Sequence, residues 1–348
     1  MTEIHTMSPI DLPPIEVRDG YSRFFGRYWS PLLRESDLID GQPTSARLLD
    51  HALVVARLNG SIVVMDDLCR HFQAALSLGS VEQASCGRQV LRCKYHGWAF
   101  NNTGQCVEIP QLDEERRIPG DARVKTYPVQ VKHGVVWVKL EESEAADVPE
   151  IPAAKEESLH VLPMQVTKWE CSAIRMVLSA LDDYHFAFLH EGVLGNRSRP
   201  QAPSRTINRY NTSLVSEFSV VQPANITNSP AGYVKAEASV DYTMKVDIPN
   251  VISLIKRNPL GTYVVWFATS PRSIRHTDVF WTVARSYDLE PDSDERVIKQ
   301  ESMIQGQDQP IVASQRPWVQ TALPIRDVDD ALVAYLKWLN ELGCPTAV

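Results

Sequence analysis

The chain of 348 residues lacks the marks of several large protein classes. No stretch approaches the roughly 18 consecutive apolar residues that a membrane-spanning helix needs. No run of Lys and Arg concentrates positive charge, and the net charge is −8, which argues against nucleic acid as the main partner because phosphate binding needs a basic surface. Residues 1–20 lack the basic and apolar segments of a secretory signal. We therefore expect a cytoplasmic chain without a membrane partner.

Cysteine is also scarce, with six residues in the whole chain. Thiols stay reduced in the cytosol, so these cysteines are better interpreted as metal ligands or buried thiols than as disulfides. The apolar fraction of 44% and the charged fraction of 22% are typical of a soluble globular protein. The length allows two ordinary domains or one large domain.

Two regions of different pattern follow one another along the chain. Up to about Leu140, short apolar runs separated by turn signals such as Asn59-Gly60 predict an all-β domain. The acidic stretch Glu141–Glu157 contains two prolines and is typical of a linker. We predict a tail (residues 1–20), an all-β domain (21–145) and an α+β domain (146–348). The predicted strands are Ala52–Leu58, Ile62–Met65, Val135–Leu140, Ser213–Val221, Val234–Val246, Tyr263–Ser270 and Val279–Tyr287, and the predicted helices are Glu170–His190, Asp294–Ser314 and Val328–Leu342.

Four candidate metal ligands lie in two short stretches of the all-β region. Cys69 and His71 are two residues apart, and Cys93 and His96 are three apart. Each stretch offers one thiolate and one imidazole towards a shared centre. A Rieske-type [2Fe–2S] cluster needs two thiolates on one iron and two imidazoles on the other, and this set supplies them.

A structural zinc ion with the same four ligands is the alternative. Zinc sites usually group like ligands in pairs, whereas cysteine and histidine alternate here. The alternation favours the iron–sulfur cluster. Cys86 lies in the spacer of 21 residues between His71 and Cys93. We interpret Cys86 as part of a hairpin extension and not as a ligand.

The same stretches carry a family resemblance. Cys69–Gly79, Cys93–Trp98, Asn102–Pro110 and Gly134–Val138 resemble the Rieske domain of ring-hydroxylating and demethylating oxygenases. The family usually has Pro between the first Cys and His, Arg-Gly after that His, and Pro after the second Cys. This chain carries Arg70, Phe72-Gln73 and Lys94 at these positions.

Arg70 and Lys94 have two interpretations. Two cations beside the cluster would favour its reduced state and raise its potential. They are equally explained as solvated side chains on an exposed loop tip, where most charged residues lie.

A second candidate metal site follows in the α+β region. His185 and His190 are five residues apart, so both rings can reach one metal from nearly one face of a helix. With one carboxylate they would form the two-histidine, one-carboxylate triad of non-haem iron oxygenases. Alone the pattern is weak, because two histidines among aromatic residues can also be packed core residues.

This segment resembles the iron-binding stretch of the same family. The resemblance places His185 and His190 at the iron-binding histidines, and Asp182 at an aspartate that links a neighbouring subunit's cluster to the iron. It places the third ligand at Asp308, in the stretch Gln307–Gln315, with Glu301 as the rival. Leu178-Ser179 replaces a polar pair of the family, and Asp183 has no family counterpart.

The resemblance covers about residues 20 to 343 and implies an architecture and a reaction. The expected fold is an all-β Rieske domain followed by an α+β helix-grip (START-like) domain with an antiparallel sheet. The expected activity is that of the terminal component of a monooxygenase, which hydroxylates or demethylates a small organic substrate with O2 and mononuclear Fe(II). A ferredoxin or ferredoxin-reductase would supply electrons from NAD(P)H, and the chain would form a homotrimer.

Two other functions remain open at this point. A ring dioxygenase would insert two oxygen atoms instead of one. An electron carrier would have lost its second site, although the set Asp182, His185, His190 and Asp308 is intact. For the substrate pocket we predict apolar and aromatic side chains, namely Val177, Leu181, Ile252, Trp266 and Phe280.

Overall fold

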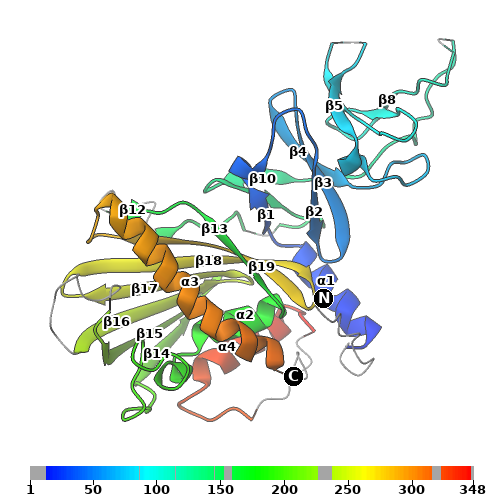
Figure 1. Ribbon diagram of the computed structural model, residues 1–348. Helices are drawn as coiled ribbons and strands as arrows, with labels where there is room; N and C mark the ends of the chain where they lie inside the picture. The colour runs from blue at the N-terminus through cyan, green and yellow to red at the C-terminus, as the bar shows by residue number, and fades with distance from the viewer. Residues whose placement is uncertain are drawn as a thin grey trace, which may run out of the picture. The chain divides into compact units, whose positions relative to one another are not determined.

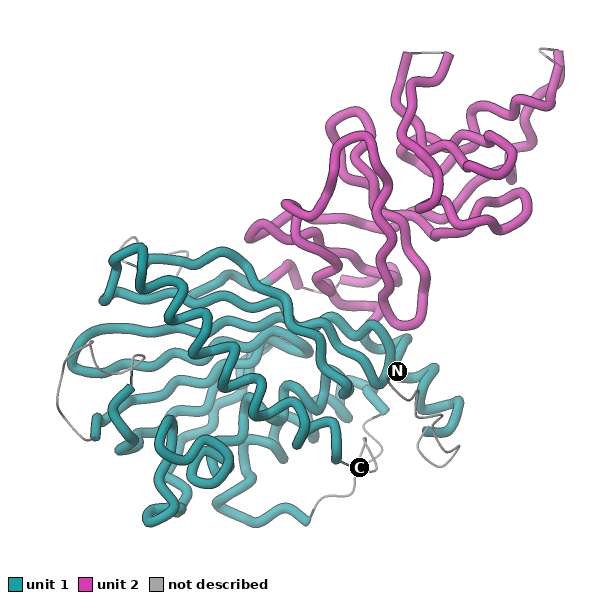
Figure 2. The backbone as a smooth tube through the Cα atoms, in the orientation of Figure 1, with its two compact units in different colours: residues 1–25, 149–348 teal, residues 26–148 magenta. Residues whose placement is uncertain are grey.

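The computed structural model describes residues 13–85, 87–113, 115–144, 146–152, 159–225, 237–315 and 323–345. The chain forms two compact units (Figure 2). One unit is Gly26–Val148, and the other combines the residues up to Phe25 with those from Pro149 onward. None of the described helices is both long and apolar enough to cross a membrane.

The unit boundaries differ from the predicted domain boundaries at both ends. Helix α1 (Ile15–Gly26) overlaps the end of the predicted tail, and its residues up to Phe25 belong with the C-terminal unit. The Tyr21 hydroxyl accepts a hydrogen bond of 3.1 Å from the Ala173 backbone nitrogen, and both groups are buried. A buried pair between residues 152 positions apart cannot be seen in a sequence pattern.

The described residues of the unit Gly26–Val148 form three small antiparallel sheets (Figure 1). Their strand orders are β1-β11-β10, β2-β3-β4-β9 and β5-β6-β7-β8. Short 3-10 turns η2 (Glu35–Asp37) and η3 (Leu76–Leu78) connect strands. The strands are β1 (Ser30–Arg34), β2 (Thr44–Leu48), β3 (His51–Leu58), β4 (Ser61–Asp66), β5 (Ser80–Gln83), β6 (Gln89–Arg92), β7 (Ala99–Phe100), β8 (Cys106–Glu108), β9 (Thr126–Tyr127), β10 (Val129–Lys132) and β11 (Val135–Val138).

The second unit is built on an antiparallel sheet of eight strands. Helices α2 (Ala173–Leu181) and α3 (Pro291–Ser314) lie against it, and α4 (Asp330–Glu341) follows near the C-terminus (Figure 1). The predicted order of an all-β domain followed by an α+β domain is therefore confirmed. The strands are β12 (His160–Val161), β13 (Gln165–Trp169), β14 (Arg205–Arg209), β15 (Ser213–Pro223), β16 (Glu237–Asp247), β17 (Val251–Asn258), β18 (Gly261–Ser273) and β19 (His276–Arg285).

The helix predicted for Glu170–His190 is much shorter in the structure. Ser172 begins α2 by accepting a hydrogen bond from the Arg175 backbone nitrogen, and the helix ends at Leu181 because Asp182 is extended (φ −83°, ψ 121°). The Asp182 carboxylate then accepts a hydrogen bond of 2.9 Å from the Tyr184 backbone nitrogen, which turns the chain into the 3-10 segment η5 (Tyr184–Ala187). Short polar side chains of this kind compete with helical backbone bonds.

Candidate metal centres

Two loops of the first unit carry Cys69 and Cys93 in the same backbone frame. The Cys69 nitrogen donates to the carbonyl five residues later (2.8 Å), and its carbonyl accepts from the nitrogen of Gln73 (2.9 Å). The Cys93 nitrogen and carbonyl make the same two bonds, with the nitrogen of Gly97 as the second donor. One loop follows β4 and the other joins β6 to β7. The sequence pattern of two similar stretches thus becomes two similar loops.

The four predicted cluster ligands come together with the thiols inside. Cys69 and Cys93 are each 2% exposed, whereas the Nδ1 atoms of His71 and His96 face one another at 3.1 Å and both rings are half-buried. Burial raises the pKa of the Cys69 thiol to about 11. Two buried sulfurs and two outward imidazoles are the donor set of a Rieske cluster, with the histidine iron nearer the surface. The residues therefore fit the group.

The surroundings of this site are open to solvent. Phe72 and Tyr95 are 69% and 66% exposed, and the side chains of Arg70 and Lys94 are exposed on the loop tips. Trp98 stacks on the His71 ring, with centroids 4.6 Å apart and planes at 6°. Cys86, which we interpret as part of a hairpin extension and not as a ligand, lies outside the described residues.

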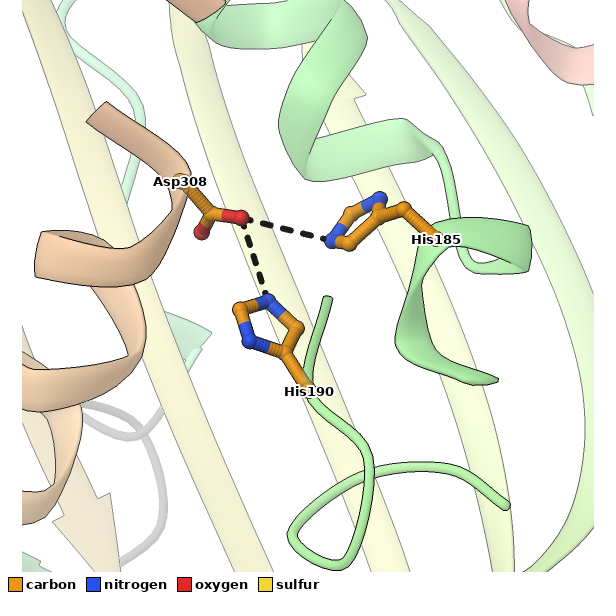
Figure 3. Close-up of side chains that lie close together, drawn as sticks. All are labelled: His185, His190 and Asp308. Carbon is orange, nitrogen blue, oxygen red and sulfur yellow. Dashed lines mark ion pairs between the residues drawn. The ribbon is translucent and has the colours of Figure 1, made fainter. Parts of the chain in front are cut away.

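The second site joins His185 and His190 to Asp308 of α3 (Figure 3). The Asp308 Oδ1 atom lies 3.5 Å from His185 Nε2 and 3.1 Å from His190 Nε2. His185 belongs to η5, and His190 follows it without a helix between them. The prediction that both rings share a helical face is wrong, because α2 has already ended; a tight turn brings the two rings together instead.

Each histidine of this site uses its other ring nitrogen for a second contact. The Nδ1 atom of His190 lies 2.7 Å from Gln307 Oε1, and that of His185 lies 3.5 Å from Asp182 Oδ2. Such contacts orient a metal-binding ring and select its tautomer. Burial alone would lower the pKa of His185, but Asp182 and Asp308 outweigh it and raise that pKa. The contact of Gln307 with His190 was not predicted from the sequence. There, Gln307 was named only as the first residue of the stretch that contains Asp308.

The atoms that face the centre of the triad suit a metal ion. Asp308 Oδ1 and His190 Nε2 are both buried without a hydrogen-bond partner in the described part of the chain. Buried polar atoms normally have partners, so two acceptors side by side without one suit a cation between them. The rival Glu301 is outside this group, because it accepts a hydrogen bond of 2.9 Å from Tyr263. The geometry favours Asp308.

Asp183 has a partner that the sequence did not indicate. Its carboxylate forms a buried ion pair with Arg205 of β14, and burial raises the pKa of Asp183. The Arg205 guanidinium also lies over the rings of Tyr184 and Phe218. Asp183 is thus neither a surface residue nor a ligand of the triad; it anchors the segment that carries Asp182 and His185.

Two cavities border the triad. The outer cavity, of about 630 Å³, extends over α2, α3 and α4, and Leu178 and Ser179 both line it. The inner cavity is smaller and lies between α2, α3 and the sheet. Ser179, His185 and Asp308 line both.

None of the five predicted pocket residues lines either cavity, so this part of the prediction is not reproduced. Along β18 the side chains alternate between the two faces of the sheet, and Phe267 is the one that lines the inner cavity. Trp266 and Phe280 therefore point to the opposite face, as the pairing of Phe267 with Trp281 requires. Val177 and Leu181 lie on the buried side of α2, and Ile252 lies two residues before the lining residue Leu254 on β17.

Comparison with known proteins agrees with both centres. The Rieske [2Fe–2S] domain model matches residues 28–128, and the vanillate O-demethylase oxygenase C-terminal domain model matches residues 169–343. Pseudomonas putida methylxanthine N1-demethylase is 28% identical over 92% of this chain and 89% of its own, and the N3-demethylase of the same organism is 28% identical over 95% and 92%.

Solved structures give the same result for the fold. The P. putida N1-demethylase with caffeine superposes with a TM-score of 0.79 at 26% identity, covering 93% of this chain and 92% of that one. Dicamba monooxygenase bound to dicamba shares the fold, with a TM-score of 0.73 at 16% identity, covering 92% and 98%. Proteins of this family receive electrons through a ferredoxin or reductase and form oligomers. The chain belongs to the Rieske non-haem iron oxygenases, as the terminal oxygenase component that carries a Rieske [2Fe–2S] cluster and a mononuclear iron.

Proposed function

We propose that His185, His190 and Asp308 hold the mononuclear iron, and that Cys69, His71, Cys93 and His96 hold the cluster. The observation that supports the iron site most is the pair of buried, unpartnered atoms Asp308 Oδ1 and His190 Nε2, 3.1 Å apart. Iron at this triad would supply oxygen activation, with two protein nitrogens and one carboxylate leaving coordination positions open. Gln307 and Asp182 keep the two rings in orientation.

The proposed reaction is hydroxylation of an N- or O-methyl group, which releases formaldehyde. The printed names of the full-length relatives support demethylation, since they are N1- and N3-demethylases. The outer cavity suits a small organic molecule, because ligand pockets are commonly about 300–1,000 Å³. Its apolar wall includes Leu178, Ile311 and Leu336.

We propose further that electrons pass from His96 of one subunit to Asp182 of the next, in a homotrimer. The Asp182 side chain is 30% exposed and its carboxylate lies 3.5 Å from His185, so it faces both the solvent and the triad. A ferredoxin or ferredoxin-reductase would donate NAD(P)H-derived electrons to the cluster. The cytoplasm is the proposed compartment, because the described cysteines are free and buried.

The experiment that tests the iron site is substitution of Asp308 by Ala. The wild-type protein should contain about three irons per chain, two of them in the cluster. The variant should keep a normal Rieske EPR signal, retain about two irons and release no formaldehyde. Glu301→Ala is the matched control on the same helix, and it should keep the third iron. Loss of the third iron in the control, and not in Asp308→Ala, would reverse the assignment.

A second experiment separates demethylation from ring dihydroxylation. Turnover of N-methyl and O-methyl aromatic compounds with labelled O2 should place one labelled atom in the product and yield formaldehyde. Two labelled atoms on an aromatic ring would identify a dioxygenase. A protein with a cluster but no third iron and no substrate-dependent O2 uptake would be an electron carrier.

A further inference from the structure

The inner cavity is lined by nitrogen donors that the metal site does not use. Lys256 of β17 and Gln305 of α3 line it, together with Trp169 at the end of β13. All three residues are at least 95% buried. Such groups are seldom left without acceptors, because an unpaired buried donor is costly. The cavity, of about 50 Å³, also contacts His185, His190 and Asp308, so a small polar group that enters it lies beside the triad.

Two of these donors have no hydrogen-bond partner in the described residues. Both amide atoms of Gln305 and the indole nitrogen of Trp169 are fully buried and unpartnered. The ammonium of Lys256 lies 5.8 Å from the ring centroid of Tyr242 and 5.3 Å from that of Tyr263. Burial lowers the pKa of Lys256, and the charge of Glu301 opposes this effect.

The hydroxyl groups of the neighbouring tyrosines already form hydrogen bonds with other residues. Tyr263 donates to Glu301 Oε1 at 2.9 Å, and Tyr242 donates to Gln222 Oε1 at 2.8 Å. The tyrosines therefore present mainly their rings to Lys256. The nitrogen donors available to a ligand in this cavity are therefore those of Lys256, Gln305 and Trp169, beside the amide oxygen of Gln305.

We infer that the inner cavity recognises an oxygen acceptor of the substrate, a carboxylate or a carbonyl, through Lys256 and Gln305. This inference rests on the proposed function and adds a substrate class to it. An oxygen-bearing group in the inner cavity would meet three nitrogen donors in a place with little water, where each hydrogen bond is strong. A substrate without such a group would leave these donors unpaired, which makes the cavity selective.

The test is calorimetric binding to the iron-loaded protein without oxygen or reductase, so that it does not depend on turnover. The probes are benzoate, benzamide and toluene, which share a ring and differ in the acceptor. The wild type should bind benzoate, benzamide or both more tightly than toluene. Lys256→Met and Gln305→Leu should weaken the preferred probe by about tenfold while leaving toluene unchanged, because each removes a hydrogen bond to an oxygen.

The variants also separate the two sources of the acceptor. If Lys256→Met weakens benzoate more than benzamide, the substrate carries a carboxylate; an equal loss identifies a carbonyl. Lys256→Arg should retain binding, because it keeps a charged donor. The matched controls are Lys245→Met, on the neighbouring strand with its side chain on the opposite face of the sheet, and Gln300→Leu, five residues earlier on α3. Both should bind like the wild type.

Several results would overturn the inference. A wild type that shows no preference for the oxygen-bearing probes over toluene, including one that binds none of them, has no acceptor site. Equal losses for all three probes in the Lys256 and Gln305 variants, with lower unfolding temperatures, would mark these residues as structural. Normal iron content and formaldehyde release alongside either result would leave the proposed function standing.

Discussion

Gln73 occupies a backbone position that ordinarily suits glycine. It has φ +56°, and Gly97, its equivalent in the other ligand loop, has φ +78°. Both nitrogens donate to the carbonyl of the cysteine four residues before them. A residue with a Cβ atom pays a steric cost of about 1–2 kcal/mol in this left-handed conformation. The first loop therefore holds a strain that the second loop avoids.

Replacing Gln73 by Gly should relieve this strain. We expect the free energy of unfolding of the cluster-loaded protein to rise by about 0.5–1 kcal/mol, because part of the gain is offset by the greater freedom of glycine in the unfolded chain. Chemical denaturation followed by the cluster's absorption would measure it. Gln73→Ala is the control and should show no comparable gain. A less stable glycine variant would contradict the argument.

Arg70 and Lys94 belong to the surface of the same loops. Both side chains are exposed, so their charges act on the cluster through solvent and on any docked protein directly. We expect Arg70→Gln with Lys94→Gln to raise the KM for an acidic electron donor by about 3- to 10-fold at low salt, and less at high salt. Donor-dependent reduction rates against ionic strength would show it. A salt-independent rate would indicate that neither cation takes part in docking.

Candidate ligands could be predicted from the sequence because the residues that coordinate one centre often follow short local patterns. Cys69 with His71, and Cys93 with His96, each need only a short loop, and the structure brings all four together. The contacts of the ligands were harder to predict. Gln307 and Arg205 act across 117 and 22 positions, and a sequence offers no sign of such distant pairs.

At the scale of elements, the segment after α2 is held by one buried ion pair. Asp183 and Arg205 are 2% and 4% exposed at their side chains, and Arg205 also covers the ring of Tyr184. Removing one partner of such a pair leaves a buried charge alone, which typically costs about 3–5 kcal/mol. The ion pair thus couples strand β14 to the loop that presents His185.

Arg205→Met should therefore destabilise the protein by about 3 kcal/mol or more and lower its content of mononuclear iron, while the cluster signal stays normal. The double variant Asp183→Asn, Arg205→Met should lose less than the two single variants combined, because no charge is then left unpaired. Thermal unfolding and iron analysis would measure both effects. Strict additivity of the two substitutions would show that the pair is not coupled.

The strands and helices were predicted less well than the ligand loops where their exact bounds and faces matter. Four strands of the large sheet, β15, β16, β18 and β19, were predicted, because β-rich runs bounded by turn residues are a strong signal; β12, β13, β14 and β17 were missed. A shift of one residue along a strand changes which side chains face the site. We predicted Trp266 as a pocket residue, but its neighbour Phe267 lines the cavity. The helix before His185 was predicted too long because Asp182 ends it through a local hydrogen bond.

At the scale of the whole molecule, the two centres belong to different compact units, and the proposed route joins them between subunits. If each electron crosses to a neighbour, a chain that lacks its cluster and a chain that lacks its iron should complement one another in a mixed oligomer. A route within one subunit predicts no such rescue, because neither chain then has both centres. The two routes therefore differ in a measurable way.

Co-expression of Cys93→Ser and Asp308→Ala chains should restore formaldehyde release to about a quarter of the wild-type rate per chain. In a cyclic trimer assembled at random, each interface has one chance in four of placing an intact cluster beside an intact iron site. Each variant alone should be inactive, and size-exclusion chromatography should confirm that the mixed oligomers form. Asp182→Ala in the chain with the intact iron should abolish the rescue, because the carboxylate between the interface and His185 is then gone. Mixed trimers that form yet stay inactive would exclude the route through Asp182 of a neighbouring subunit.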